Sequence, residues 1–113
     1  MALPSRGDVW MVDLGQNPGL EQGKRRPALV VSVDRYNHTA AELIVIVPIT
    51  TTVRKIPMHI EVYPPEGGLE YHSCIQCDQP RCVSRVRFAR RLGAIAAETM
   101  ERVEDRLRIL LDL

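Results

Sequence analysis

Three consecutive cations, Lys24, Arg25 and Arg26, stand directly before a proline and an apolar run. Pro27 fixes its own φ and disfavours the helical region for the residue before it, so Arg26 is expected on stiff, extended backbone. The apolar, β-branched residues that follow predict a buried strand. A guanidinium held at the mouth of a sheet is suited to binding a phosphate, because its paired N–H donors match the phosphate oxygens.

The three histidines could supply acid–base chemistry, and the sequence does not favour it. His38, His59 and His72 are far apart in the chain, and no pattern brings two of them together. Each is therefore expected to be an exposed structural histidine rather than half of an acid–base pair.

A zinc site is the second alternative. His72, Cys74, Cys77 and Cys82 provide enough ligands for one. The residues between Cys74 and Cys77 are typical of a strand, on which these two side chains would point to opposite faces. We therefore expect buried apolar thiols, and predict no metal and no cofactor.

Composition narrows the class of protein. A chain of 113 residues predicts one domain over 1–113, and its 45% hydrophobic and 4% aromatic content predicts an aliphatic core. A net charge of +1 excludes a globally basic nucleic-acid-binding protein. Neither a bilayer-spanning segment nor a secretion signal is evident, and the odd number of cysteines argues against a disulfide framework. These features predict a cytoplasmic protein that does not contact membranes.

Hydrophobic periodicity predicts short strands followed by one helix. The strands are expected at residues 9–14, 28–33, 43–49, 58–63, 73–78 and 90–95. Residues 34–39 are expected to form a turn or exposed loop, and Pro48 fits the margin of a strand. From about Ala97 an apolar stripe with helical spacing begins. The order predicts an α+β fold with mostly antiparallel pairing, in which function lies on a surface groove formed by loops.

Six segments occur in an order that carries a resemblance over nearly the whole chain. They are Arg6-Gly7-Asp8-Val9-Trp10, Glu21-Gln22-Gly23, Arg26-Pro27-Ala28-Leu29-Val30-Val31, Val47-Pro48-Ile49-Thr50-Thr51, Cys77-Asp78-Gln79-Pro80-Arg81 and Arg91-Leu92-Gly93. Together they resemble the MazF/PemK (Kid-like) family of toxin endoribonucleases. The ordered set, rather than any one motif, makes the resemblance.

The resemblance implies both a fold and an activity. The fold would be a small SH3-like, mostly antiparallel β-barrel with a C-terminal α-helix, working as a homodimer. The activity would be a sequence-selective, metal-independent cut in single-stranded RNA, with a cognate antitoxin occupying the RNA groove. The catalytic residues of the family map onto Arg26 and Thr50, and its loop glutamate maps onto Glu21.

The residue chemistry fits that implication in part. Without a metal, the substrate's own 2′-OH would attack the phosphate and yield a 2′,3′-cyclic phosphate and a 5′-OH. Arg26 can neutralise the crowded phosphate, and Thr50 can donate a further hydrogen bond. Arginine is a poor proton shuttle because its pKa is above about 12. Glu21 is the chemically easier general base, so we expect Glu21 and Arg26 to share the work.

Further RNA contacts are predicted for Gln22, Lys24, Arg25, Asn37, Thr51, Gln79 and Arg81. For Gln79 and Arg81, contact with the antitoxin or a structural role remains an alternative, and Asn37 could belong to a plain loop. A different class of function also remains open, namely a non-enzymatic toxin or binding module on the same barrel, such as a gyrase-poisoning inhibitor. The pair Arg26 and Thr50 favours the nuclease, because a module that only grips a protein would not need it.

Overall fold

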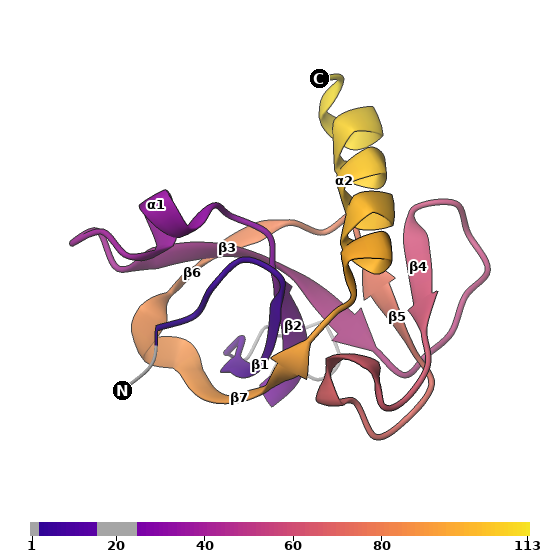
Figure 1. Cartoon of the computed structure of the whole chain (residues 1–113), viewed down its shortest axis with the longest axis horizontal. Coiled ribbons are helices and arrows are strands. Elements are labelled where there is room, and N and C mark those ends of the chain that lie inside the picture. Colours follow the sequence, from indigo (N-terminus) through magenta and orange to yellow (C-terminus); the bar gives the residue numbers. More distant parts are fainter. Residues whose placement is uncertain (1–2, 16–24) are drawn as a thin grey trace.

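The computed structural model describes residues 3–15 and 25–113, which form one curled sheet flanked by a long C-terminal helix (Figure 1). The strands of this part of the chain are β1 (Asp8–Asp13), β2 (Arg25–Val30), β3 (Leu43–Thr50), β4 (His59–Val62), β5 (Ser73–Gln76), β6 (Arg81–Ser84) and β7 (Phe88–Ala94). The helices are α1 (Asp34–Asn37) and α2 (Ala97–Leu111), with single 3-10 turns η1 (Glu66–Gly68) and η2 (Arg85–Arg87).

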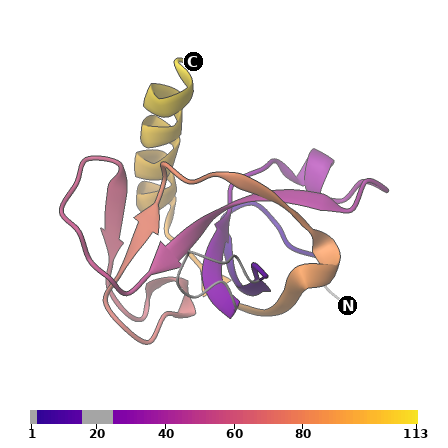
Figure 2. The same ribbon diagram turned by 180° about the vertical axis from the view of Figure 1, so that it is seen from behind.

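The sheet is antiparallel and centred on β3. Its strand order is β4-β5-β3-β2-β1-β7, and β6 pairs with the first half of β3 while β5 pairs with its end. Beyond β5 the chain curls around β3 as β6 and returns beside β1 as β7 (Figure 2). The antiparallel pairing and the terminal helix confirm the predicted α+β fold. Among the described residues no backbone ladder joins β6 to β7, so the SH3-like barrel is an open, curled sheet.

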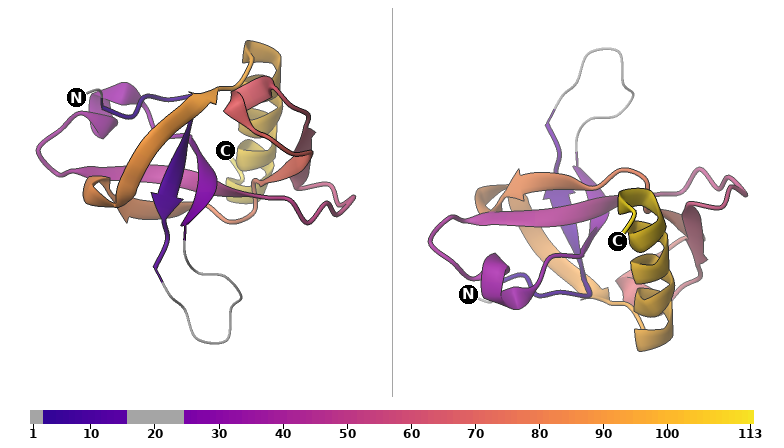
Figure 3. Two further views of the ribbon diagram at one scale, coloured as in Figure 1. Left: turned by 90° about the horizontal axis from the view of Figure 1, so that it is seen from below. Right: turned by 90° about the horizontal axis from the view of Figure 1, so that it is seen from above.

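Two apolar clusters lie on opposite faces of the sheet because side chains alternate along each strand. One face carries Trp10, Val12, Ala28, Val30, Ile44 and Ile46, which lie inside the curl with Val83 and Phe88. The other carries Val9, Leu29, Val47 and Ile49, which pack with β4, β5 and Val103 of α2. Figure 3 shows α2 beside the β4–β5 end of the sheet, which it covers on this second face.

A close backbone approach fixes the turn after β4 against β7. Gly68 has a φ of +69°, and a Cβ placed on it would lie 1.9 Å from the carbonyl oxygen of Leu92. Gly93 is the reciprocal contact, since its Cβ would lie 2.8 Å from the Gly68 nitrogen. Glycine is therefore required at Gly68, in the turn that follows Pro65, and at Gly93, in the Leu92-Gly93 pair of β7.

Three expectations about elements need correction. Residues 81–84 form β6, which the sequence did not predict, because only two of its residues are apolar and only Val83 is buried. The predicted loop at 34–39 contains α1. β2 begins at Arg25 rather than Ala28, so Pro27 lies inside a strand.

Pro48 also lies within a strand, two residues after the last pair of the β3–β6 ladder, Ile46 with Arg81. The ladder with β6 extends to Ile46 and the ladder with β5 starts at Ile49. Pro48 therefore occupies the position where β3 changes partners, a kind of strand margin where a missing N–H is tolerated.

No helix among the described residues is long and apolar enough to span a bilayer.

Candidate functional site

Arg26 lies at the start of β2, and Thr50 lies at the end of the neighbouring strand β3. The β2–β3 ladder pairs Ala28 with Pro48, and continuing this register by two residues sets Arg26 opposite Thr50. Directly opposite residues of an antiparallel pair share one face, with Cβ atoms about 5 Å apart. The two residues that the sequence selected for catalysis therefore lie on one face of the sheet, and the extended register would make them neighbours, although 24 positions of chain, 50 minus 26, separate them.

The backbone around Arg26 is extended, as Pro27 predicted. Arg26 pairs with Val12 of β1, and Pro27 pairs with Met11. Val12 is fully buried, so the half-buried Arg26 lies beside an apolar neighbour on the adjacent strand. The described residues form neither a hydrogen bond nor an ion pair with that guanidinium.

Thr50 holds the turn that follows β3. Its Oγ1 accepts a hydrogen bond from the backbone N–H of Thr52 at 3.1 Å. A hydroxyl has one donor and two acceptor sites, so this bond leaves the Thr50 proton available to a ligand. Thr50 is half-buried and Thr51 beside it is exposed.

Arg25 and Arg81 are exposed cations on the strands that flank β3, but strand alternation puts Arg25 on the opposite face from Arg26. Arg25 opens β2 opposite Asp13, and Arg81 opens β6 opposite Ile46. Because Ile46 and Thr50 lie on the same face of β3, Arg81 also belongs to the face that carries Thr50. Gln79 is exposed in the turn before β6, and its backbone N–H donates to the Gln76 carbonyl at 3.1 Å.

Asn37 does not join this surface. It is fully buried in α1, where its Nδ2 donates to the Ser32 carbonyl at 2.8 Å and its Oδ1 accepts from the Ser32 hydroxyl. Arg85 donates to its backbone carbonyl at 3.0 Å. The predicted base contact is therefore replaced by a structural role. Glu21, Gln22 and Lys24 lie outside the described residues.

The histidines remain apart, but not all are exposed. His59 is buried, with 4% of its side chain exposed, and its Nε2 lies 3.4 Å from Oδ1 of Asp78. The expectation of an exposed histidine is wrong for His59. The alternation of β4 shows which face of the strand His59 occupies, but it does not show which other segments cover that face. His38 is exposed and its Nε2 contacts the carbonyl of Pro4 at 3.0 Å.

Two of the three cysteines are buried thiols. Cys77 lies in the helix-covered core, where burial raises its pKa to about 12. Cys74 lies on the opposite face, with its Sγ 3.9 Å from the carbonyl of Arg54. Cys82 is exposed, contrary to expectation, because β6 leaves it outside the core. In the described segments, no three His, Cys, Asp or Glu side chains gather as ligands for a metal ion.

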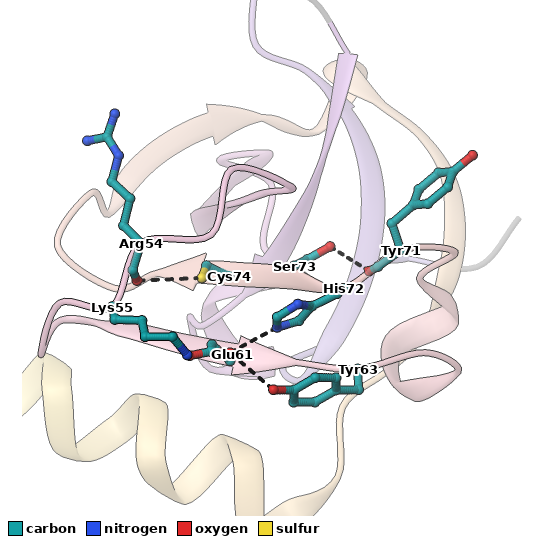
Figure 4. Close-up of polar contacts among 8 residues, drawn as sticks. All are labelled: Arg54, Lys55, Glu61, Tyr63, Tyr71, His72, Ser73 and Cys74. Carbon is teal, nitrogen blue, oxygen red and sulfur yellow. Dashed lines mark hydrogen bonds and ion pairs between the residues drawn. The ribbon is translucent and has the colours of Figure 1, made fainter.

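A polar cluster that the sequence did not predict is centred on Glu61 of β4. The Glu61 carboxylate accepts hydrogen bonds from Tyr63 at 3.1 Å and Lys55 at 3.2 Å, and its Oε1 lies 2.9 Å from Nε2 of His72 (Figure 4). The bond from Lys55, followed by those from His72 and Tyr63, lowers the pKa of Glu61, and the same contact raises the pKa of Lys55. The alternation through His59, Glu61 and Tyr63 was visible in the sequence, but the pairing with β5 was not.

Comparison with known proteins agrees with this geometry. Residues 5–111 match the model of the PemK-like, MazF-like toxins of type II toxin–antitoxin systems. The chain belongs to this family. It is 34% identical to endoribonuclease MazF9 of Mycobacterium tuberculosis, over 96% of each protein.

Two solved structures of MazF-like proteins show the same fold. A crystal structure of MazF from Deinococcus radiodurans superposes over the full length of both chains with a TM-score of 0.86 at 27% identity. An endoribonuclease from a mycobacterial species, solved in complex with its cognate antitoxin, gives a TM-score of 0.79 at 29% identity, over 97% of this chain and 96% of its own. The predicted family and the predicted class of enzyme, an endoribonuclease, are thereby confirmed.

Proposed function

We propose that this MazF-like chain is a toxin that cleaves single-stranded RNA without a metal, at a site formed by Arg26 and Thr50. The observation that supports the proposal is the β2–β3 register, which pairs Ala28 with Pro48 and, if continued by two residues, would set Arg26 opposite Thr50 on one face. The name of the mycobacterial relative, an endoribonuclease, supports the same activity.

In the proposed reaction the 2′-OH of one nucleotide attacks the adjacent phosphorus. A new P–O2′ bond forms while the P–O5′ bond breaks, which leaves a 2′,3′-cyclic phosphate and a free 5′-OH. The 2′-OH proton passes to a general base, for which Glu21 is proposed, and the leaving O5′ takes up a proton from water, so that no net proton is consumed once the base returns its proton to solvent. No redox partner or added reactant is required.

Arg26 and Thr50 stabilise the charge that develops on the phosphate. The fork of Arg26 can donate two parallel hydrogen bonds to the non-bridging oxygens, and its charge does not depend on pH in the working range. The Thr50 hydroxyl, whose acceptor side is engaged by Thr52, donates the third. Exposed Arg25 and Arg81 would hold flanking phosphates, with Thr51, Gln79, Gln22 and Lys24 as further proposed contacts.

Purified protein and a broad single-stranded RNA pool test the proposal in the presence of EDTA. We expect cleavage to continue, with 5′-OH ends whose sequencing reveals the cut site. Arg26→Ala and Thr50→Ala should each abolish cleavage while circular dichroism stays unchanged. Arg90→Ala is the matched control, because Arg90 is an exposed cation on the edge strand β7. Absence of cleavage by the wild-type protein would favour the non-enzymatic binding module instead.

We further propose that a cognate antitoxin binds this same surface. The mycobacterial endoribonuclease, solved in complex with its own cognate antitoxin, supports the existence of such a partner. An acidic, partly apolar tail could occupy the phosphate positions beside Arg25, Arg26 and Arg81. Such a tail should compete with RNA in a fluorescence anisotropy titration, and simultaneous binding of both would contradict the shared surface. Homodimerisation is likewise proposed from the family and is tested by light scattering on the purified chain.

A further inference from the structure

The polar cluster around Glu61 lies on the same face of the sheet as Thr50. Thr50 pairs with Cys74 of β5, and Cys74 pairs with Glu61 of β4, so these three residues form one row across neighbouring strands. Adjacent strands lie about 4.8 Å apart, which places Glu61 about 10 Å from Thr50 along the row. Val103 and α2 pack on the opposite face and do not cover this one.

The next row on this face ends in two stacked rings. Val62 pairs with Ser73, and continuing this register by one residue sets Tyr63 opposite His72. The two rings are nearly parallel, with an interplanar angle of 9° and centroids 4.3 Å apart. Tyr63 lies two strands away from β3 and two residues further along than the row of Thr50. At about 4.8 Å per strand and about 3.4 Å per residue, a flat sheet would put it about 12 Å from Thr50.

The Glu61 carboxylate fixes both rings in place. Its Oε1 accepts the Tyr63 hydroxyl at 3.1 Å and lies 2.9 Å from Nε2 of His72, as Figure 4 shows. Lys55 Nζ lies 3.2 Å from the other carboxylate oxygen, Oε2, and this ion pair offsets the negative charge of Glu61. The residues form a preorganised unit, in which an aromatic ring is held by a hydrogen bond on one side and by stacking on another.

That held ring is also open to solvent. Tyr63 is 60% exposed even though it is hydrogen-bonded and stacked. Holding a surface tyrosine in one orientation costs side-chain entropy. A flat, exposed ring that is already ordered is the feature that single-stranded nucleic-acid binders use to stack a base.

Positive charge accompanies the ring. Lys55 and Arg54 are both exposed in the segment that follows β3, directly after Thr50 and Thr51. The Arg54 carbonyl accepts from Cys74, which anchors this segment over the row, while the Arg54 side chain points away from Glu61 (Figure 4). The segment therefore leads from the proposed catalytic threonine to the stacked rings. Lys55 is paired with Glu61, and Arg54 is the cation of this segment that can meet a phosphate.

We propose that the Tyr63–His72 stack is a subsite for a nucleobase of the RNA strand flanking the cleaved phosphodiester. This inference rests on the proposed ribonuclease function and deepens it by adding a binding position outside the Arg26–Thr50 pair. The subsite binds by stacking, so it accepts any base and strengthens the binding of long RNA over short RNA. Tyr63 is a binding residue here, and Glu61 is a positioning residue that acts through it.

The test uses an RNA whose cut site has been mapped and whose attacking nucleotide carries a 2′-deoxy sugar, so that it binds without being cleaved. Dissociation constants are measured by fluorescence anisotropy for this RNA and for versions shortened from either end. Tyr63→Leu should weaken binding of the long RNA about 5- to 150-fold, the range expected for one lost base stack, and leave a suitably shortened RNA unaffected. Tyr63→Phe keeps the ring and should retain most of the affinity.

Tyr71→Leu is the matched control, because Tyr71 is 66% exposed but takes part in no ring stack recorded among the described residues. An abasic nucleotide placed in turn along the flank tests the same idea with unaltered protein, so a misfolded variant cannot obscure the result. We expect one abasic position to weaken wild-type binding and to have no added effect in Tyr63→Leu.

The outcomes separate the two proposals. Wild-type protein that neither binds nor cleaves any RNA would overturn the ribonuclease function and this subsite with it. Wild-type protein that cleaves, with no abasic position affecting affinity or with equal losses in Tyr63→Leu and Tyr71→Leu, would overturn the subsite alone.

Discussion

Replacing Thr50 by valine separates chemistry from folding at the proposed site. Valine keeps the branched shape and removes only the hydroxyl. One lost bond is the contact with the Thr52 N–H at 3.1 Å, which is exposed and contributes about 0.5–1.5 kcal/mol to stability. The other is the proposed donation to the phosphate, and removing such a donor costs about 2.7–4 kcal/mol in the transition state. Turnover should therefore fall about 100- to 1,000-fold, while the free energy of unfolding changes by about 1 kcal/mol.

Single-turnover cleavage of a fluorescent RNA gives the rate, and urea unfolding gives the stability. Thr50→Ser is the control, because serine can make both hydrogen bonds and should retain most of the activity. The affinity for uncleavable RNA should change little in Thr50→Val, since the donor acts mainly in the transition state. If Thr50→Val cleaved RNA as fast as the wild-type protein, the role assigned to the hydroxyl would be refuted.

Four further predictions concern the site and the fold. Arg26→Lys keeps the charge but loses the paired donors, so cleavage should slow about 10- to 100-fold. Gly68→Ala should lower the free energy of unfolding by about 3 kcal/mol or more, measured in urea, because its Cβ would overlap a carbonyl oxygen at positive φ. Glu61 has a pKa below its ordinary value of 4.5, so it stabilises the fold above that pH; the stability advantage over Glu61→Gln should vanish as the pH falls through the lowered pKa. Iodoacetamide at pH 8 should label Cys82, which is exposed, and spare Cys77, whose thiol has a pKa of about 12, as mass spectrometry of peptides would show.

For each of these four predictions, one result would contradict it. For Arg26→Lys it is full activity, and for Gly68→Ala an unchanged urea midpoint. If the difference in free energy of unfolding between the wild-type protein and Glu61→Gln did not change with pH, the charge of the Glu61 carboxylate would not contribute to stability. Labelling of Cys77 in the native protein would show that its part of the core opens readily. Gly7→Ala is a useful control for Gly68→Ala, because Gly7 has a φ of +92° but no heavy atom near the added Cβ.

The local features of this protein were legible in the sequence. Alternating and continuous apolar runs marked most strands, and the helical stripe marked α2, because periods of two and 3.6 follow from backbone geometry alone. The dipeptide Arg26-Pro27 predicted extended backbone for the same local reason. The family followed from the order of short segments and needed no contact between them.

Contacts between distant segments could not be predicted in this way. Asn37 looked like a loop residue, and its burial depends on Ser32 and on Arg85, which is far along the chain. The change of ladder at Pro48 depends on where β6 ends and β5 begins, and β6 itself lacks the apolar alternation that would have revealed it.

The composition and order of segments in this chain were enough to specify its class, its mostly antiparallel strands and the residue best suited to meet a phosphate. The tertiary structure supplied the cross-strand register, which brings Tyr63 beside His72 and puts the proposed pair Arg26 and Thr50 on one face. Register is settled by which buried side chains fill the two cores together, and that is a property of the whole sheet. The pattern within one strand shows which face a residue occupies, but its partner on the neighbouring strand is known only once the chain has folded.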